Sequence, residues 1–318
     1  DYTYLDAMKF YRTSLWESKG YDVLFPEFEV RKVGNQILTN PQLHYPNVSA
    51  TLGTTYSFDN RSKLFLNYSV ASRAPNPSEL FSEGLHHSAS RIEIGKLDLN
   101  SEVAHNVSLS YKFQNEVLNI SVNSFVNTIQ GFIVIEPTGV QQTIRGNFQV
   151  WEYRQTDAQL LGFDWDVSYL FAKDFRFNHQ FSFLKGYDRI QNEALINMPP
   201  VNTQNEIVYQ NPKIKNLRIS LQSNYVFMQN EYPNNNFEVF IPETGTTELV
   251  DVSTPPDAYH LLNFSSSITL RSTNKSKFTV GLDITNMMNT SYRNYLNRLR
   301  YYADDTGRNF LLNLKFNY

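Results

Sequence analysis

The stretch that decides the fold prediction is GRNFLLNLKFNY, residues 307–318. Phe310, Leu312, Leu314, Phe316 and Tyr318 alternate with polar residues, chiefly Asn and Lys. A period of two places one set of side chains on one face of a β-strand and the other set on the opposite face. The segment is therefore predicted to be a strand with one apolar and one polar face.

The same alternation recurs along the whole chain. Clear stripes span residues 48–58, 64–70, 107–113, 118–126, 161–171, 175–183, 217–227, 262–270 and 278–284. Weaker alternations lie at 1–11, 150–157 and 203–210. Together they predict about twelve strands.

The connections between these stripes alternate in length. Short polar turns are expected near 59–62, 114–117, 172–174, 211–216 and 273–276. Long connections are expected near 12–45, 72–104, 134–149, 186–202, 229–257 and 287–306. Tight periplasmic turns and long external loops are typical of an up-and-down outer-membrane barrel, so we expect an all-β antiparallel transmembrane β-barrel.

Charged residues within the strands keep to the polar phase. They are Lys112, Asp164, Asp166, Arg176, Arg218, Asp283 and Lys315. A charge that faces lipid at mid-depth costs roughly 2–4 kcal/mol for Arg or Lys, whereas the lumen tolerates it. These residues are expected to face the lumen. A soluble β-sandwich would show the same phase, but the aromatic stripes and the alternating connection lengths favour the barrel.

Composition narrows the function classes. The net charge is −3 and cysteine is absent, so there is no sign of a nucleic-acid binder, a disulfide framework or a thiolate metal site. The sequence contains no run of eighteen apolar residues, so no transmembrane helix is predicted. No nucleophile triad, phosphate loop, metalloprotease or dinucleotide motif is present either, so we expect neither an enzyme nor a bound cofactor.

Three ordered elements resemble TonB-dependent outer-membrane receptors. The first is SATLGTTYSF (49–58) followed by KLFLNYSVASRAPNPSELF (63–81), which contains the family's Arg-Ala-Pro…Glu-Leu element. The second is LDLNSEVAHNVSLSYKF (97–113), and the third is the last hairpin (282–318). The residues that match the motifs and are expected to be structural are Arg73, Pro75, Glu79, Gly307 and Arg308, with Asn286 and Asn289 beside the last two.

The resemblance implies that the chain is the C-terminal half of a 22-stranded barrel whose N-terminal plug domain is absent. We expect residues 1–318 to form a single barrel segment. A half-receptor completed by a partner chain and a smaller barrel that closes by itself are the alternatives. The family's terminal residue is usually Phe, which the barrel-assembly machinery recognises. Tyr318 is also aromatic and is expected to serve the same purpose.

The resemblance also implies energy-coupled uptake of a scarce solute across the bacterial outer membrane. The partners would be the TonB energy-transducing complex, reached through the plug, together with the assembly machinery and lipopolysaccharide. Family solutes include siderophores, haem, zinc, cobalamin and glycans. The alternative is a non-transporting barrel that acts as a surface-binding or structural module in a larger assembly.

Two long connections carry candidate ligand contacts. Residues 82–95 hold the only adjacent histidine pair, His86 and His87, near Glu83 and Glu93. Imidazole and carboxylate suit zinc or a metal complex, although neighbouring residues rarely ligate one ion together, so a metal site would use His86 or His87 with distant ligands. A solvated loop is the plain alternative, and the pair favours a metal complex as the solute.

The second connection mixes Arg298 and Arg300 with tyrosines, which suits an anionic siderophore, a glycan or lipopolysaccharide. Residues 230–257 are an acidic segment rich in turn formers, which either shapes specificity or is a variable loop. Asp164 and Asp166 have no feature that would give them unequal pKa values as a catalytic pair. We expect them to form salt bridges to lumenal Arg or Lys or to the plug.

Overall fold

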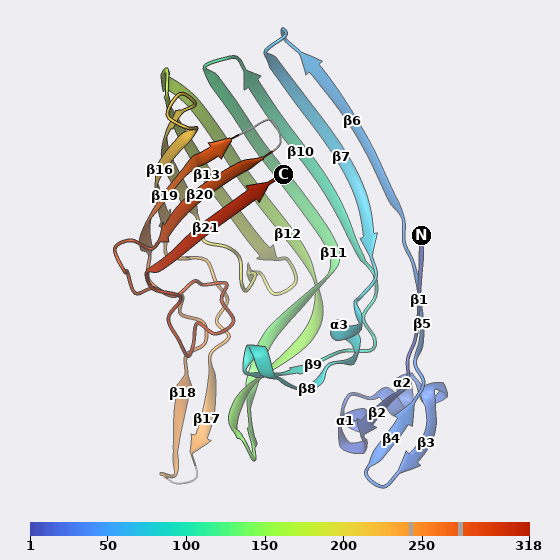
Figure 1. Ribbon diagram of the computed structural model, residues 1–318. Helices are drawn as coiled ribbons and strands as arrows, with labels where there is room; N and C mark the ends of the chain where they lie inside the picture. Colours follow the sequence, from blue (N-terminus) through green and yellow to red (C-terminus); the bar gives the residue numbers. More distant parts are fainter. Residues whose placement is uncertain (242–243, 273–275) are drawn as a thin grey trace.

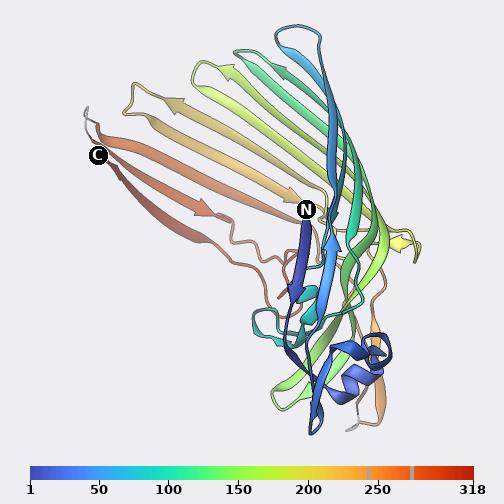
Figure 2. The ribbon, with the colours of Figure 1, turned by 90° about the vertical axis from the view of Figure 1, so that its right-hand side faces the viewer.

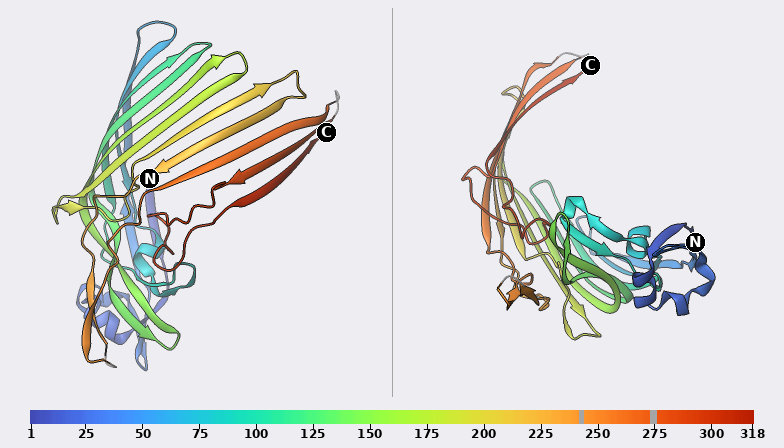
Figure 3. Two further views of the ribbon diagram at one scale, coloured as in Figure 1. Left: turned by 90° about the vertical axis from the view of Figure 1, so that its left-hand side faces the viewer. Right: turned by 90° about the horizontal axis from the view of Figure 1, so that it is seen from below.

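A computed structural model describes residues 1–241, 244–272 and 276–318. Its main feature is one curved antiparallel sheet in which sequential strands lie side by side (Figure 1). The strands are β6 (Ser49–Ser57), β7 (Ser62–Arg73), β10 (Glu102–Gln114), β11 (Leu118–Thr143), β12 (Gly146–Ala172), β13 (Phe175–Asp188), β15 (Asn202–Asn211), β16 (Leu217–Val226), β19 (Tyr259–Ser272), β20 (Lys277–Thr285) and β21 (Asn309–Asn317). Seen from below, the sheet is an arc (Figure 3). Within the described residues, β6 and β21 form its two edges.

The all-β antiparallel prediction is confirmed. The eleven strands of this path follow the alternating stripes of the sequence, and β1 (Tyr2–Asp6) adds to the predicted count of about twelve. β1 pairs with β5 (Gln42–Pro46), which leads through Asn47 and Val48 into β6. The short turns fall where predicted, except that residues 273–275 of the last one lie outside the described residues.

The prediction of a long loop at 134–149 is wrong. β11 and β12 continue as one hairpin to Thr143 and Gly146, and the predicted strands at 150–157 and 161–171 are parts of the single strand β12. The pairing register shifts between Ile129 and Phe132 and again between Pro137 and Gly139. Each bulge inserts a residue and changes the face of every side chain beyond it, so the period of two breaks although the pairing continues.

The strand register places all the predicted lumenal charges on one face. Asp166 lies opposite Ser121 and Gln180, and Ser121 lies opposite Lys112. The same argument from strand to strand joins the remaining positions to this face: Asp164, Arg176, Arg218, Asp283 and Lys315. We call it the inner face, because the polar face of a transmembrane barrel lines the lumen.

The predicted loop at 12–45 contains a small module of its own. It comprises β2 (Lys9–Arg12), α1 (Thr13–Ser18), α2 (Tyr21–Leu24), η1 (Pro26–Phe28), β3 (Glu29–Val33) and β4 (Gln36–Thr39). Its core consists of Tyr11, Trp16, Tyr21, Phe28 and Ile37, together with Leu97 from the connection between β7 and β10. Aromatic residues bury much apolar area per residue, which allows so short a segment to pack. The module lies at the long-connection end of the sheet (Figure 1).

The other long connections also carry local structure. Between β7 and β10 lie α3 (Pro77–Phe81), β8 (Glu83–His86), η2 (His87–Ala89) and β9 (Arg91–Ile94). β14 (Glu193–Ala194) follows β13, and β17 (Phe237–Ile241) pairs with β18 (Thr246–Val250) in the segment 230–257, of which residues 242–243 are not described. None of the helices in the described residues is both long and apolar enough to cross a membrane.

An ion-pair corner joins the end of β7 to α3 and β10. The Arg73 guanidinium contacts a Glu79 carboxylate oxygen at 3.0 Å and a Glu102 oxygen at 2.9 Å. The side chain of Asn76 caps α3, and Glu79 accepts a hydrogen bond from the Asn76 backbone N–H, which completes a capping box. Pro75 is buried at this corner. The corner fixes the direction in which the connection 82–95 leaves the sheet.

The last hairpin has a second fixed corner. Asn286 and Asn289 both adopt positive φ, which asparagine tolerates better than most residues. The Asn289 side chain accepts a hydrogen bond from the Arg308 backbone N–H at 2.9 Å. A Cβ at Gly307 would lie 2.8 Å from the same Asn289 oxygen, so a larger residue would push the Asn289 amide away from this hydrogen bond. Tyr318 is fully exposed beyond β21 and stacks on Phe316.

Gly95 allows β9 to lie against α3. A Cβ at this position would come within 2.6 Å of the Leu80 backbone. We expect Gly95→Ala to lower the free energy of unfolding by about 1–3 kcal/mol, because backbone must move to admit the methyl group. Urea unfolding of the reconstituted receptor measures this change. Gly139→Ala, with open space around its Cβ, is the control and should behave as wild type. Equal stability of both variants would contradict the prediction.

Candidate functional site

A pocket of about 210 Å³ lies where three long connections meet the extended β11–β12 hairpin. The connections are 82–95, the segment after β14, and 287–306. Figures 2 and 3 show the first and the last of these on the same side of the curved sheet. The side chains that carry its chemistry are Arg91, Trp151, Arg298, Arg300, Tyr301 and Tyr302. We call it the loop pocket.

Arg300 is the central feature of the loop pocket. Its side chain is only 5% exposed, and its guanidinium lies over the rings of Tyr295 and Tyr301, 4.4 and 4.6 Å from their centroids. It donates hydrogen bonds to the Asn197 side chain at 3.1 Å, the Tyr301 hydroxyl at 2.6 Å and the Tyr295 carbonyl. Its Nε has no partner, and within the described residues no carboxylate pairs with it. A buried cation without a counter-charge is costly, and an anion placed close to this guanidinium would offset that cost.

Arg91 is a second buried guanidinium, and it is already neutralised. It contacts the Glu93 carboxylate at 2.7 Å, and both side chains are less than a tenth exposed. The guanidinium lies 4.3 Å from the centre of the Trp151 ring. β9 runs parallel to β12 and places Arg91 opposite Gln149, two residues from Trp151. The β11–β12 hairpin thus supplies the wall against which β9 packs.

The connection 287–306 is held by its own acidic residues. Asp305 accepts hydrogen bonds from the Asn294 backbone at 2.7 Å and the Asn297 side chain at 2.8 Å. Asp304 accepts from Ser291 and Arg293, and these bonds hold its pKa below the usual range. Arg293 in turn donates to the Arg300 carbonyl. These bonds position Arg300 although the connection has no helix or strand.

Tyr301 bridges the pocket to the segment before β19. Its hydroxyl donates to the Val252 carbonyl at 3.2 Å while it accepts from Arg300. Burial raises the pKa of this hydroxyl, although the charge of Arg300 opposes the shift. Tyr301 therefore stays neutral and leaves the positive charge of Arg300 uncompensated. The loop pocket contains three arginines and, through Glu93, one carboxylate in contact with them.

The predicted site residues separate into two places. Arg298 and Arg300 line the loop pocket, and Glu93 contacts it through Arg91. His86 and His87 are exposed outside its lining, although the following Ser90 carbonyl accepts a hydrogen bond from Tyr302. Glu83 points to the small module, where it pairs with Arg12 at 3.1 Å and Lys9 at 3.4 Å. Across the described part of the chain, no cluster of three or more His, Asp or Glu side chains is arranged to hold a metal ion.

The aspartates of the inner face have other partners than expected. Asp164 accepts a hydrogen bond from Ser182 at 2.6 Å and Asp166 accepts one from Gln180 at 2.9 Å. No salt bridge to Arg or Lys is found for either in the described residues. The bonding partners are their cross-strand neighbours, which lie closer than any lumenal cation.

Sequence reasoning missed Arg91, Trp151 and Asn197, whereas Tyr301 belongs to the tyrosines of the connection that the sequence had put forward. Arg91 stands two residues before Glu93, a spacing that places both on one face of a short strand, so that signal was present. Trp151 and Asn197 had no such signal. They reach the pocket only through the pairing of β9 with β12 and the fold of the connection after β14.

An antiparallel meander with a polar inner face, short turns at one end and long structured connections at the other defines a segment of an outer-membrane-type β-barrel. The family model described as "TonB dependent receptor-like, beta-barrel" matches residues 22–287. The chain therefore belongs to this family. No curated protein matches the sequence.

Solved structures of such receptors share the fold. The copper transporter OprC superposes with a TM-score of 0.64 at 15% identity, covering 88% of this chain and 40% of that chain. The siderophore receptor PirA from Acinetobacter baumannii gives 0.56 at 17%, covering 88% and 41%. A variant of the ferric enterobactin receptor PfeA from Pseudomonas aeruginosa, in complex with enterobactin, gives 0.61 at 14%, covering 88% and 41%. This chain spans about 40% of the length of these receptors.

Glu93 is expected to be important for stability because it neutralises a buried cation. Replacing one partner of a buried pair costs about 3–5 kcal/mol, so Glu93→Gln should strongly lower the free energy of unfolding. Asp98→Asn breaks the exposed pair with Lys96 (3.4 Å) and should cost less than about 1 kcal/mol. Urea unfolding of the two variants provides the comparison. If Glu93→Gln were as mild as the control, Arg91 would not depend on this carboxylate.

Proposed function

We propose that this chain is the C-terminal part of the barrel of an outer-membrane receptor for TonB-dependent uptake of an anionic metal complex. The observation that carries the proposal is Arg300, a buried guanidinium with an unbonded Nε and no ion-pair partner in the described residues. Arg298, which is exposed and has no ion pair in the described residues, adds a second cation to the lining of the same pocket.

The chemistry of the loop pocket fits a ferric siderophore best. Iron complexes of catecholate or carboxylate siderophores are anionic and present flat rings or carboxylates. Guanidinium groups form paired hydrogen bonds with such oxygens and stack on aromatic planes, and Tyr301, Tyr302 and Trp151 supply further aromatic surface. PirA and PfeA are described as siderophore and ferric enterobactin receptors, which is consistent with this class of ligand. The chain would bind and pass its ligand without bond chemistry.

The remaining parts of the proposal concern partners and placement. An N-terminal plug beyond this barrel segment would contact the TonB complex, the exposed Tyr318 would be read by the assembly machinery, and the outer faces of the strands would contact the lipids of the outer membrane. The apolar and aromatic side chains of those faces are exposed, as a lipid-facing surface requires.

Arg300 is expected to dominate ligand affinity. In the full-length receptor, Arg300→Gln should weaken binding of a ferric catecholate or ferric citrate complex by about ten- to a hundredfold, the effect of losing a charge-assisted hydrogen bond of about 1.5–3 kcal/mol. Arg298→Gln, at an exposed position, should weaken binding without disturbing the fold. Quenching of tryptophan fluorescence on titration provides the measurement.

Arg31→Gln, on the exposed strand β3, is the matched control and should bind as wild type. Retained heat-dependent mobility shows that each variant is folded. Unchanged affinity in both Arg298→Gln and a folded Arg300→Gln would reject the loop pocket as the binding site. Binding without TonB-dependent uptake in cells would favour the non-transporting surface module instead.

The histidine pair is proposed as an outer contact for the same ligand. Because His86 and His87 are exposed and lie outside the pocket lining, the double variant His86→Ala/His87→Ala should weaken binding of the ferric complex by less than Arg300→Gln does. The same titration series with zinc alone tests direct ligation. Saturable zinc binding that the double variant loses would make the pair a metal site, and loss of ferric-complex binding as large as that of Arg300→Gln would place the ligand on the histidines.

A further inference from the structure

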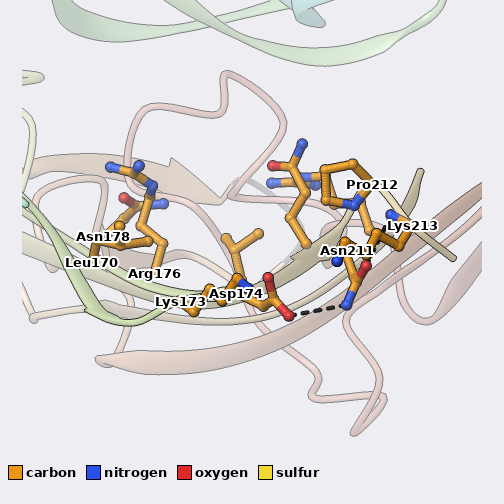
Figure 4. Close-up of a pocket in the computed structure, with 11 residues that line it drawn as sticks. Leu170, Lys173, Asp174, Arg176, Asn178, Asn211, Pro212 and Lys213 are labelled. Atoms are coloured by element: carbon orange, nitrogen blue, oxygen red, sulfur yellow. Dashed lines mark hydrogen bonds between the residues drawn. The ribbon is translucent and has the colours of Figure 1, made fainter. Parts of the chain in front are cut away.

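A second and larger cavity lies on the inner face at the opposite, short-turn end of the sheet. Its volume is about 610 Å³, and the residues around it come from the β12–β13 and β15–β16 hairpins and their turns. Figure 4 shows its polar side chains above the sheet. The cations among them are Lys173, Arg176, Lys213 and Arg218. We call it the turn-end pocket.

Most of these cations lack a counter-charge within the described residues. Arg218 pairs with Glu206 at 3.1 Å, and the same carboxylate accepts from Asn178 at 2.9 Å. Arg176 donates to the neutral Ser168 hydroxyl at 2.9 Å. No ion pair includes Lys173, Arg176 or Lys213 in the described part of the chain. The one carboxylate of the lining, Asp174, accepts a hydrogen bond from Asn211 at 2.9 Å (Figure 4).

The charges are mixed further along the inner face. Asn178 also lines a neighbouring cavity of about 420 Å³, which includes Lys112 together with the carboxylates of Asp166 and Glu206. Lys112 lies directly opposite Lys63 in the pairing of β10 with β7. Like charges directly opposite one another in a sheet are destabilising. Lys63 and Lys112 therefore place a second pair of adjacent cations near the short turns.

We propose that the turn-end pocket is an anion-binding site, separate from the loop pocket, which binds carboxylate or phosphate groups. Arg176 would supply paired donors to two oxygens of one group, and Lys173 and Lys213 would supply mobile charges from the two turns. Asn178 and Asn211 add neutral amides, while Leu170, Val208 and Pro212 form the apolar part of the lining. The cavity is large enough for a small polycarboxylate or for acidic side chains of a chain segment held in the lumen.

The charge of the pocket leads to opposite expectations with and without a bound anion. If the cations have no anion, they repel one another, and neutralising them stabilises the receptor at low salt. If they hold an anion, neutralising them removes that stabilisation. The sign of the change therefore tests the proposal even while the anion is unidentified.

The experiment compares the full-length receptor with Arg176→Gln/Lys213→Gln. The midpoint temperature of heat-dependent mobility is measured at low ionic strength, with and without millimolar inorganic phosphate or citrate. We expect the double variant to unfold several degrees below wild type at low salt, and the difference to shrink in molar salt, which screens the interaction. Arg31→Gln/Lys32→Gln, two exposed residues of β3, is the control and should not shift.

The possible outcomes of this experiment distinguish the sources of the anion. Stabilisation of wild type by added phosphate or citrate, absent in the double variant, indicates a free anion. A difference at low salt that added anions do not change indicates carboxylates of the receptor's own chain. A double variant that is as stable as wild type or more stable, with no response of either to phosphate or citrate, overturns the proposal.

Discussion

The constraint on which this structure depends is that every backbone N–H and C=O of a strand exposed to lipid must be paired within the protein, since hydrocarbon offers no partner. The ladder from β6 to β21 meets it through neighbours in sequence order for the strands between these two edges. Side chains are then free to differ completely between the two faces. The outer face carries exposed leucines, phenylalanines and tyrosines, and the inner face carries the amides, hydroxyls and charges.

The same ladder builds the loop pocket. β11 and β12 extend beyond the ends of their neighbours and pass a bulge near Gly131. Gly131 adopts positive φ, and its backbone N–H donates a hydrogen bond to the Asp157 carboxylate at 3.0 Å. Beyond the bulge the hairpin presents a new edge, and β9 pairs with it in parallel. Arg91, Glu93 and Trp151 come together as a result. The pocket is therefore a continuation of the sheet, to which the connection 287–306 adds Arg300.

The strands could be read from the sequence because a lipid-facing stripe and a polar stripe leave a period of two in the residues themselves. The stripe of Leu161, Phe163, Trp165 and Val167 is visible without reference to the rest of the chain. The hairpin beyond Phe132 could not be read this way, since its bulges change the phase while its pairing continues. The residues of the loop pocket depend on contacts between distant segments. Arg300 could be suspected from its tyrosine neighbours, but its burial arises only when Asn197 and Tyr295 surround it.

The two basic pockets show that the environment of the cations affects anion binding more than the number of cations does. Arg300 is enclosed by tyrosine rings, and the low local dielectric makes the lack of a counter-charge among the described residues costly. Arg176 and Lys213 lie in an open cavity near turns, where water and salt reduce both attraction and repulsion. An anion at Arg300 should therefore bind with short, oriented hydrogen bonds and discriminate between ligands. An anion at the turn end is held by several partly screened charges and depends strongly on ionic strength. The first arrangement suits selection of a ligand, and the second suits retention of a charged group whose detailed shape matters little.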